Sequence, residues 1–127
     1  MNNEELSGGG EPSSKGKFDT LKDLHINEKG GRKYDRNKPD WSLLTLKTLK
    51  PMVKILEMGA KKYERNNWQK VEPRRYFRAL IKHISEWQSG EVLDPETQES
   101  HLAHAMCNLY FLMYFEQNDK LTPEDLL

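Results

Sequence analysis

The stretch RRYFRALIKHISEWQSGEVLDPETQESHLAHAMCNLYFLMYF, residues 74–115, decides the fold of this chain. It is predicted to form a helix, an acidic loop and a second helix. In residues 74–90 the apolar side chains recur at spacings of three and four, which is the period of an amphipathic helix. Pro73 suits the first helical position, and Gly90 is a typical stop. The apolar positions of this first helix are Phe77, Leu80, Ile81, Ile84 and Trp87.

The second helix, residues 101–115, carries almost only apolar side chains beyond its first turn. A helix that is apolar on all sides is normally buried on all sides. His101, His104 and Asn108 nevertheless lie within about 60° of arc on this helix. Each unpaired polar group in a core costs about 1–3 kcal/mol, so these three side chains need partners. We expect the partners on the first helix and in the loop, and a functional site between them.

On the first helix, His83 and Glu86 lie about 60° apart at one edge of the apolar face. Histidines at i and i+3 on a helix, as at positions 101 and 104, can hold zinc or another transition ion. The carboxylates of the loop offer the oxygen ligands that magnesium prefers. The alternative is structural: the histidines would only fix the register of the helices, and the carboxylates would be solvated. The loop carboxylates are Glu91, Asp94, Glu96 and Glu99.

The composition restricts the class of protein. A chain of 127 residues with 20 basic and 20 acidic side chains is expected to form one domain, and its balanced charge gives no argument for a nucleic-acid or membrane partner. No apolar run reaches transmembrane length, and the N-terminus does not resemble a signal peptide. Cys107, the single cysteine, is expected to be a buried apolar group in a reducing compartment. These observations predict a soluble protein of the cytoplasm.

The remaining segments complete the expected domain organisation. Residues 1–29 are poor in apolar groups and are predicted to be disordered or loosely ordered, although residues 21–26 could dock on the domain or form a helical turn. Residues 30–127 are predicted to form a single helical domain. A further helix is expected at residues 48–63, with Pro51 in its first turn. Because no segment alternates with period two over the length of a strand, the predicted fold class is all-α.

Two further segments carry candidate substrate contacts. In the charged loop of residues 30–41, Lys33, Tyr34 and Lys38 could reach a polyphosphate, because lysine is a common partner of phosphate. The alternative for this loop is a solvated surface segment. Trp68 is either a core residue or a platform on which a base stacks.

Four phrases of the sequence, taken in order, resemble the phage-type dATP/dGTP diphosphohydrolase N-terminal family. The resemblance implies a small all-α helical bundle, related to the MazG-like nucleoside triphosphate pyrophosphohydrolases and completed by dimerisation. It also implies cleavage of a deoxynucleoside triphosphate between its α- and β-phosphates, in the cytoplasm of a bacterium that hosts a phage or prophage. The phrases are KYDRNKPDWSLL (33–44), GAKKYERNNW (59–68), RRYFRALIKHISEWQSGE (74–91) and DPETQESHLAHAMCNLYFL (94–112).

In that wider group, magnesium or manganese is held by carboxylates in ExxE and ExxD patterns on two helices. Here HLAHA, residues 101–105, stands where an ExxD pair would be expected, and His83 with Glu86 forms an HxxE pattern. Three arrangements follow from this departure. The loop carboxylates supply the oxygen ligands, the histidines coordinate a softer ion, or the histidines position water or phosphate beside a metal that few carboxylates hold. Loss of activity is a fourth outcome.

The leading hypothesis is a metal-dependent pyrophosphohydrolase for dATP or dGTP, with Mg²⁺ or Mn²⁺ as its cofactor. The expected catalytic residues, which would position or deprotonate the attacking water, are His101 and His104, together with His83. The expected metal ligands are Glu91 and Asp94, with Glu86 and Glu96 as further ligands. The expected substrate-binding residues are Lys33, Lys62 and Arg75 for the phosphates, and Tyr34, Trp68 and Asn108 for the base or sugar.

Two expectations concern partners. The apolar second helix predicts a homodimer that buries Leu109, Leu112 and Met113, because so short a chain has few other helices to cover it. No membrane or nucleic-acid partner is expected. The rival hypothesis is a catalytically silent helical phage factor that binds a nucleotide or a host protein. Loop carboxylates directed into solvent would favour that rival.

Overall fold

A computed structural model describes residues 24–34 and 36–127 of the chain. The chain divides into two compact units, residues 1–43 and residues 44–127. The segment predicted to be disordered, residues 1–29, falls mostly outside the described residues. Within the described ranges, no helix has both the length and the apolar character needed to cross a bilayer.

The first unit contains a short antiparallel hairpin, in which β1 (Leu24–Ile26) pairs with β2 (Arg32–Tyr34), and it ends in a 3-10 turn, η2 (Trp41–Leu43). Asn27 stabilises the hairpin turn, because its side-chain oxygen accepts hydrogen bonds from two backbone nitrogens of the turn. The helical turn considered for residues 21–26 is therefore wrong for the described part of that segment. Period-two alternation could not reveal these strands, because three residues are too few to show it.

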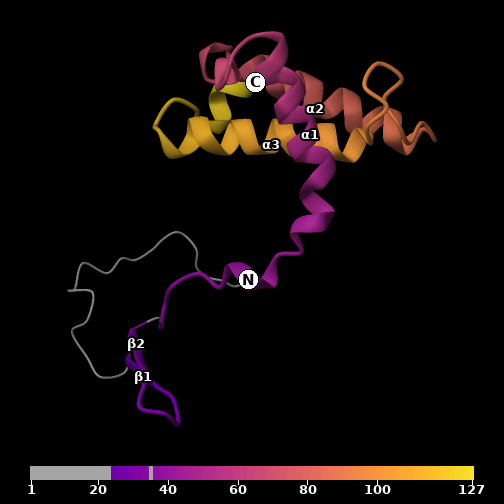
Figure 1. Ribbon diagram of the computed structural model, residues 1–127. Helices are drawn as coiled ribbons and strands as arrows, with labels where there is room; N and C mark the ends of the chain where they lie inside the picture. The colour runs from indigo at the N-terminus through magenta and orange to yellow at the C-terminus, as the bar shows by residue number, and fades with distance from the viewer. Residues whose placement is uncertain (1–23, 35) are drawn as a thin grey trace. The chain divides into compact units, whose positions relative to one another are not determined.

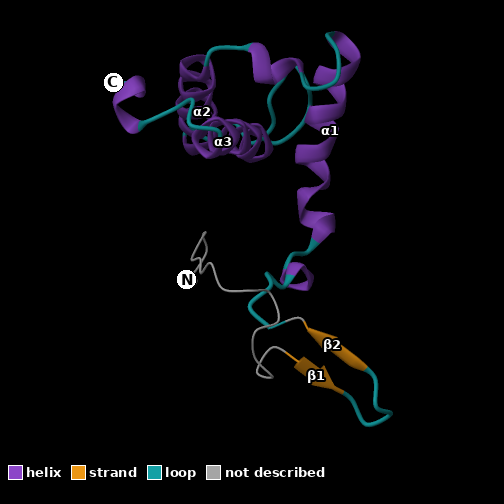
Figure 2. Ribbon diagram, turned by 90° about the vertical axis from the view of Figure 1, so that its left-hand side faces the viewer, coloured by secondary structure: helices purple, strands orange, loops and turns teal. Residues whose placement is uncertain are grey.

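The second unit is built from three α-helices, α1 (Leu46–Lys62), α2 (Pro73–Gln88) and α3 (His101–Gln117). Two 3-10 turns complete it: η3 (Asn67–Lys70) precedes α2, and η4 (Pro123–Leu126) follows α3. Helices α2 and α3 lie side by side, and α1 packs against α3 (Figure 1 and Figure 2). This arrangement confirms the predicted all-α fold class.

The helix ends follow from local sequence signals. Pro73 occupies the first turn of α2, and Ser100 caps α3 by accepting a hydrogen bond from the backbone nitrogen of Leu102 at 3.0 Å. Helix α1 begins at Leu46, before the predicted start at residue 48. Pro51 consequently lies inside the helix, and its predicted place in the first turn is wrong.

The core of the second unit forms where α2 and α3 meet. Its most deeply buried apolar side chains all come from α3: Ala105, Cys107, Leu112 and Phe115. Cys107 is 2% exposed, so the prediction of a buried cysteine is confirmed, and burial raises the pKa of its thiol to about 12. Trp68, which lies in η3, extends this core. The centroid of its ring lies 4.6 Å from the centroid of the Phe111 ring.

One side of α3 remains exposed within the single chain. The side chains there recur at spacings of four and three, and each is between 43% and 54% exposed: Leu102, Met106, Leu109 and Met113. The chain alone therefore does not bury α3 on every side, as expected for a chain with so few other helices. Leu112, which was expected in a dimer interface, is instead buried within the chain itself.

Candidate functional site

The loop between α2 and α3 folds back on itself and presents carboxylates to the helices. Gly90 opens the loop at a φ of +111°, a conformation that other residues rarely adopt. Inside the loop, the backbone nitrogen of Asp94 donates to the carbonyl oxygen of Glu99 at 2.8 Å, and that of Gln98 donates to the carbonyl oxygen of Asp94 at 2.7 Å. Gln98 itself has a φ of +62°. This compact backbone buries Asp94, which is only 8% exposed.

One cluster of polar side chains surrounds His101, which is fully buried. Nδ1 of His101 lies 2.8 Å from Nδ1 of His83, so one of these nitrogens carries a proton that the other accepts. Nε2 of His101 lies 2.7 Å from a carboxylate oxygen of Glu91, and Nδ1 lies 3.6 Å from one of Glu86. Both ring nitrogens of His101 are therefore engaged, which holds its imidazole in one orientation.

A second cluster forms around His104, one turn further along α3. The rings of His83 and His104 stack, with centroids 4.5 Å apart and planes inclined by 10°. Nε2 of His104 lies 2.7 Å from the Thr97 hydroxyl and 3.2 Å from a carboxylate oxygen of Asp94. His83 thus belongs to both clusters, and the loop supplies oxygen partners to each.

Burial keeps His83 and His104 neutral at physiological pH. It lowers the pKa of His83 to about 4, and the nearby His104 and Lys82 act in the same direction. Burial also lowers the pKa of His104, against the opposing effect of Asp94. Burial alone would raise the pKa of Asp94, but the hydrogen bond from the Glu96 backbone nitrogen and the adjacent histidines lower it overall. The site therefore combines neutral imidazoles with an ionised carboxylate.

These donor atoms form two groups that could hold a metal ion. The first comprises His83, Glu86 and His101, and the second comprises His83, Asp94 and His104. Within each group the potential ligand atoms lie within 4.8 Å of one another. Imidazole nitrogen combined with carboxylate oxygen suits manganese or another transition ion better than magnesium, which prefers oxygen ligands alone.

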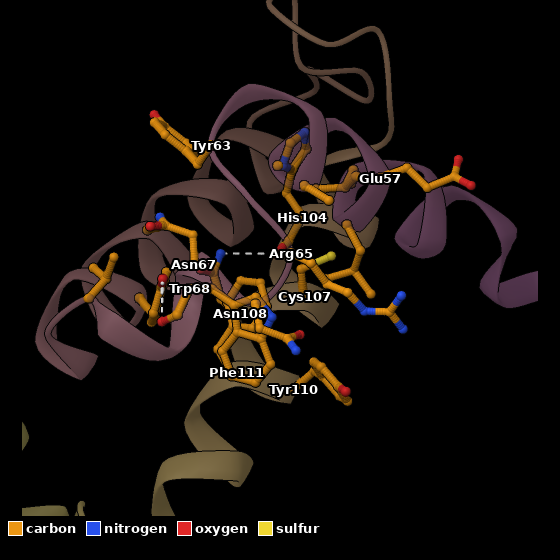
Figure 3. Close-up of a pocket in the computed structure, with 18 of the residues that line it drawn as sticks. Glu57, Tyr63, Arg65, Asn67, Trp68, His104, Cys107, Asn108, Tyr110 and Phe111 are labelled. Atoms are coloured by element: carbon orange, nitrogen blue, oxygen red, sulfur yellow. Dashed lines mark hydrogen bonds between the residues drawn. The ribbon is translucent and has the colours of Figure 1, made fainter.

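A pocket of about 1100 Å³ adjoins the histidines (Figure 3). His83 and His104 form part of its wall, and α1, η3, α2 and α3 all contribute residues to it. A largely apolar lining with a few polar groups is typical of a small-molecule site. The aromatic and cationic side chains that line it are Tyr63, Trp68, Tyr110 and Phe111 with Arg65 and Arg75, to which Tyr76 adds a further ring.

The structure brings most of the predicted catalytic and metal-binding residues together. The three histidines and three of the four carboxylates meet in the two clusters: His83, His101, His104, Glu86, Glu91 and Asp94. The side chain of Glu96 is exposed. Its backbone nitrogen donates a hydrogen bond to a carboxylate oxygen of Asp94 at 3.2 Å. Glu91 and Asp94 contact histidines, whereas Glu96 is exposed, so the loop carboxylates are not all directed into solvent.

The predicted substrate-binding residues are distributed over both units. Three of them line the pocket: Trp68, Arg75 and Asn108. Trp68 also makes ring contacts with four aromatic side chains, so it is a core residue as well as a pocket residue. Lys62 is exposed at the end of α1 and does not line the pocket. Lys33 and Tyr34 belong to β2 in the first unit.

Several residues of the site were not predicted from the sequence. The Thr97 hydroxyl contacts His104 because the loop turns back at Gln98, which has a left-handed backbone. Such a conformation at a residue other than glycine is hard to predict from the sequence. Arg65 reaches the pocket from the turn after α1. In the sequence, Arg65 stands beside Asn66 and Asn67, and asparagine pairs favour turns.

The sequence matches known proteins over most of its length. A family model described as "dATP/dGTP diphosphohydrolase, N-terminal" matches residues 28–125. A curated protein, dATP/dGTP diphosphohydrolase from Salmonella phage PMBT28, is 32% identical over 95 residues, which are 75% of this chain and 32% of that protein. The chain thus spans about a third of the length of the curated relative it matches. No solved structure matches the chain.

Proposed function

This chain belongs to the dATP/dGTP diphosphohydrolase N-terminal family, and from this membership we propose that it hydrolyses purine deoxynucleoside triphosphates with the help of a divalent metal ion. Water would add across the bond between the α- and β-phosphates and give the deoxynucleoside monophosphate and pyrophosphate. The relative from Salmonella phage PMBT28 carries dATP and dGTP in its name, which supports a purine deoxynucleotide as substrate. Because that relative is a phage protein, we assign the activity to the cytoplasm of a bacterial host.

The observation that carries this proposal is the pair of histidine and carboxylate clusters that share His83 at the wall of the pocket. A purely structural role would not require them, because apolar side chains join two helices without the cost of desolvating charge. Titratable groups with shifted pKa values beside a cavity are typical of functional sites. His83, Asp94 and His104 have such shifts.

The residues present fit a divalent ion. Neutral His83 and His104 each have a nitrogen lone pair to offer, and ionised Asp94 supplies negative charge. When bound, the ion would neutralise charge on the phosphate oxygens and lower the pKa of a coordinated water. The mixed donors favour Mn²⁺ over Mg²⁺ among the two expected ions. Glu96, exposed and outside both clusters, is not needed in this assignment.

The surrounding side chains would hold the histidines in position. Glu91 approaches His101 from the loop, and the Thr97 hydroxyl approaches Nε2 of His104. His101 is fully buried with both nitrogens engaged, so it would act as a ligand or a positioning residue. His83 and His104 both line the pocket. Where the ion is held by the group of His83, Glu86 and His101, the lone pair of His104 would be available to orient or deprotonate the attacking water.

Arginine side chains at the pocket would bind the triphosphate. Arg75 lies 3.7 Å from Glu72 in an exposed ion pair, and such pairs contribute little. A phosphate can replace that carboxylate, because contacts between arginine and phosphate are charge-assisted and often bidentate. Arg65 lines the same pocket and would assist. The substrate contacts of Lys62, Lys33 and Tyr34 stay predictions.

A pyrophosphate-release assay tests the proposal. The protein is incubated with each of the four common deoxynucleoside triphosphates in the presence of Mn²⁺, Mg²⁺ or excess EDTA. We expect release from dATP or dGTP that EDTA abolishes, with faster release in Mn²⁺ than in Mg²⁺. If no metal supports release but nucleotides still raise the melting temperature, the chain is a silent nucleotide-binding factor. If neither occurs, the clusters have a structural role alone.

We also propose that the chain forms a homodimer through the exposed side of α3. The apolar residues at positions 102, 106, 109 and 113 support this, because a contiguous apolar patch is typical of a protein interface. Light scattering at micromolar concentration is expected to give twice the mass of the chain, and Met106→Lys is expected to give a monomer. A monomeric mass for the unmodified chain would contradict the proposal.

A further inference from the structure

Asn108 is a buried polar side chain whose hydrogen-bonding capacity is incompletely used. It lies on α3, is 6% exposed and lines the pocket. Its Nδ2 donates to the carbonyl oxygen of His104 at 2.9 Å, and this contact determines which end of the carboxamide is the oxygen. Among the residues that the structure describes, none donates a hydrogen bond to that oxygen, Oδ1. Because a buried acceptor without a donor is costly, the position favours a donor from a bound molecule.

The place of Asn108 on α3 indicates which part of a nucleotide would provide the donor. Four residues of helix correspond to about 6 Å, so Asn108 lies one turn beyond His104. Tyr110 and Phe111 follow it and bring aromatic rings to the same pocket (Figure 3). In a nucleotide the sugar lies between the phosphates and the base. With the phosphates at the histidines and the base at the aromatic rings, the sugar reaches Asn108.

We propose that Oδ1 of Asn108 accepts a hydrogen bond from the 3′-hydroxyl of the substrate's deoxyribose and thereby selects nucleotides that carry this group. The inference rests on the proposed function, because it takes the substrate to be a deoxynucleoside triphosphate with its phosphates at the histidine clusters. The 3′-hydroxyl is the single hydroxyl of that sugar. Asn108 is then a specificity-determining residue and takes no part in proton transfer.

The test compares dATP with 2′,3′-dideoxyATP, which lacks the hydroxyl, in the pyrophosphate-release assay. For the wild-type protein, kcat/KM is expected to be roughly 10- to 100-fold lower for the dideoxy compound. In Asn108→Leu, which replaces the amide with an apolar group of similar size, the two values are expected to become nearly equal. Asn108→Asp keeps an acceptor oxygen and is expected to retain the discrimination. Equal kcat/KM values with the wild-type protein would overturn the proposal, and this comparison needs no variant to fold.

A second pair of substrates separates the sugar from the base. The exocyclic amine of guanine is another donor, and dITP lacks it while dGTP carries it. If Asn108→Leu removes a preference for dGTP over dITP and leaves the preference for dATP over dideoxyATP unchanged, Asn108 contacts the base and the proposal is wrong. The expected result is the reverse.

Failure of the proposed function can be distinguished from failure of this inference. If the wild-type protein hydrolyses no nucleotide, the proposed function fails, and the melting-temperature shifts produced by dATP and dideoxyATP then test the inference by themselves. A larger shift with dATP that Asn108→Leu removes would support the sugar contact. Equal shifts, or no shift with either compound, would overturn it.

Discussion

The two ends of the α2–α3 pair are held together by different forces. At one end aromatic rings pack on one another, and the ring centroids of Tyr76 and Phe111 lie 4.7 Å apart. The Tyr76 hydroxyl also donates a hydrogen bond to the carbonyl oxygen of Trp68 at 2.9 Å. At the other end His83 meets His101 through ring nitrogens and carboxylates. Apolar contact depends on buried area, whereas the polar contacts depend on protonation and direction. The aromatic end can therefore secure the pair while the polar end is organised for chemistry.

The largest expected effect is the loss of activity when the polar end is changed. His83→Ala and His104→Ala are each expected to lower kcat/KM at least about 100-fold, because His83 is a potential metal ligand and His104 is the proposed base. Circular dichroism should remain helical, since the aromatic contacts persist. The matched control is His25→Ala, an exposed histidine of β1, which should leave turnover unchanged. A fully active His104→Ala variant would refute its assigned role.

The aromatic end is expected to determine stability. Phe115 is 4% exposed, and Phe115→Ala should lower the free energy of unfolding by about 3–5 kcal/mol. Urea denaturation measures this loss, and Glu116→Ala, at the exposed neighbouring position, should change stability by less than about 0.5 kcal/mol. Where the Phe115 variant remains folded, it should turn over substrate at the wild-type rate. A loss of turnover as large as that of His104→Ala would remove the distinction between the two ends.

The polar end is expected to make stability depend on pH. The pKa of His83 is lowered to about 4 in the folded protein from an ordinary value near 6.5. Between about pH 4 and pH 6.5 the unfolded chain therefore binds more protons than the folded protein. Stability is then lost as the pH falls from about 6.5 towards 4, and the lowered pKa of His104 acts in the same sense. Between pH 7 and pH 5 we expect His83 to account for a loss of about 1–2 kcal/mol.

Urea unfolding of metal-free protein at the two pH values measures this dependence. His83→Gln, which cannot titrate in this range, should show a smaller loss between pH 7 and pH 5 than the wild-type protein. The same loss in both proteins would show that His83 does not carry the effect.

The smallest expected effect concerns the entry to the loop. Gly90 has a φ of +111°, so Gly90→Ala is expected to cost about 1–2 kcal/mol of stability through backbone strain. Gly59→Ala is the matched control, because an added Cβ at this position of α1 meets no atom within 4 Å. It should stabilise the protein by about 0.5–1 kcal/mol. Equal melting temperatures for the two variants would show that the left-handed turn is not required.

The helices of the site were predictable because their signals are local. Apolar spacing defined α2, and the line formed by His101, His104 and Asn108 correctly indicated which side of α3 carries polar contacts. Pro73 and Gly90 marked the two ends of the first helix, and both stand at the ends that the structure shows. These features depend on residues three or four positions apart, which is the distance over which helical periodicity operates.

The direction of the loop side chains could not be predicted in this way. Sequence alone gave no reason why Asp94 should turn inwards and Glu96 outwards, because the difference depends on the backbone bonds that close the loop. The contact between Thr97 and His104 depends on the same bonds.

The separation of the paired histidines along the chain has a consequence for the order of folding. His83 and His101 lie 18 positions apart, and one short loop joins the helices that carry them. Contacts between residues close in sequence form quickly, because little chain entropy is lost when the intervening segment closes. The residues of the two histidine and carboxylate clusters should therefore assemble as the helical hairpin closes. The wall contributed by α1, which contacts Cys107 through the carbonyl oxygen of Met52 at a separation of 55 positions, would complete the pocket afterwards.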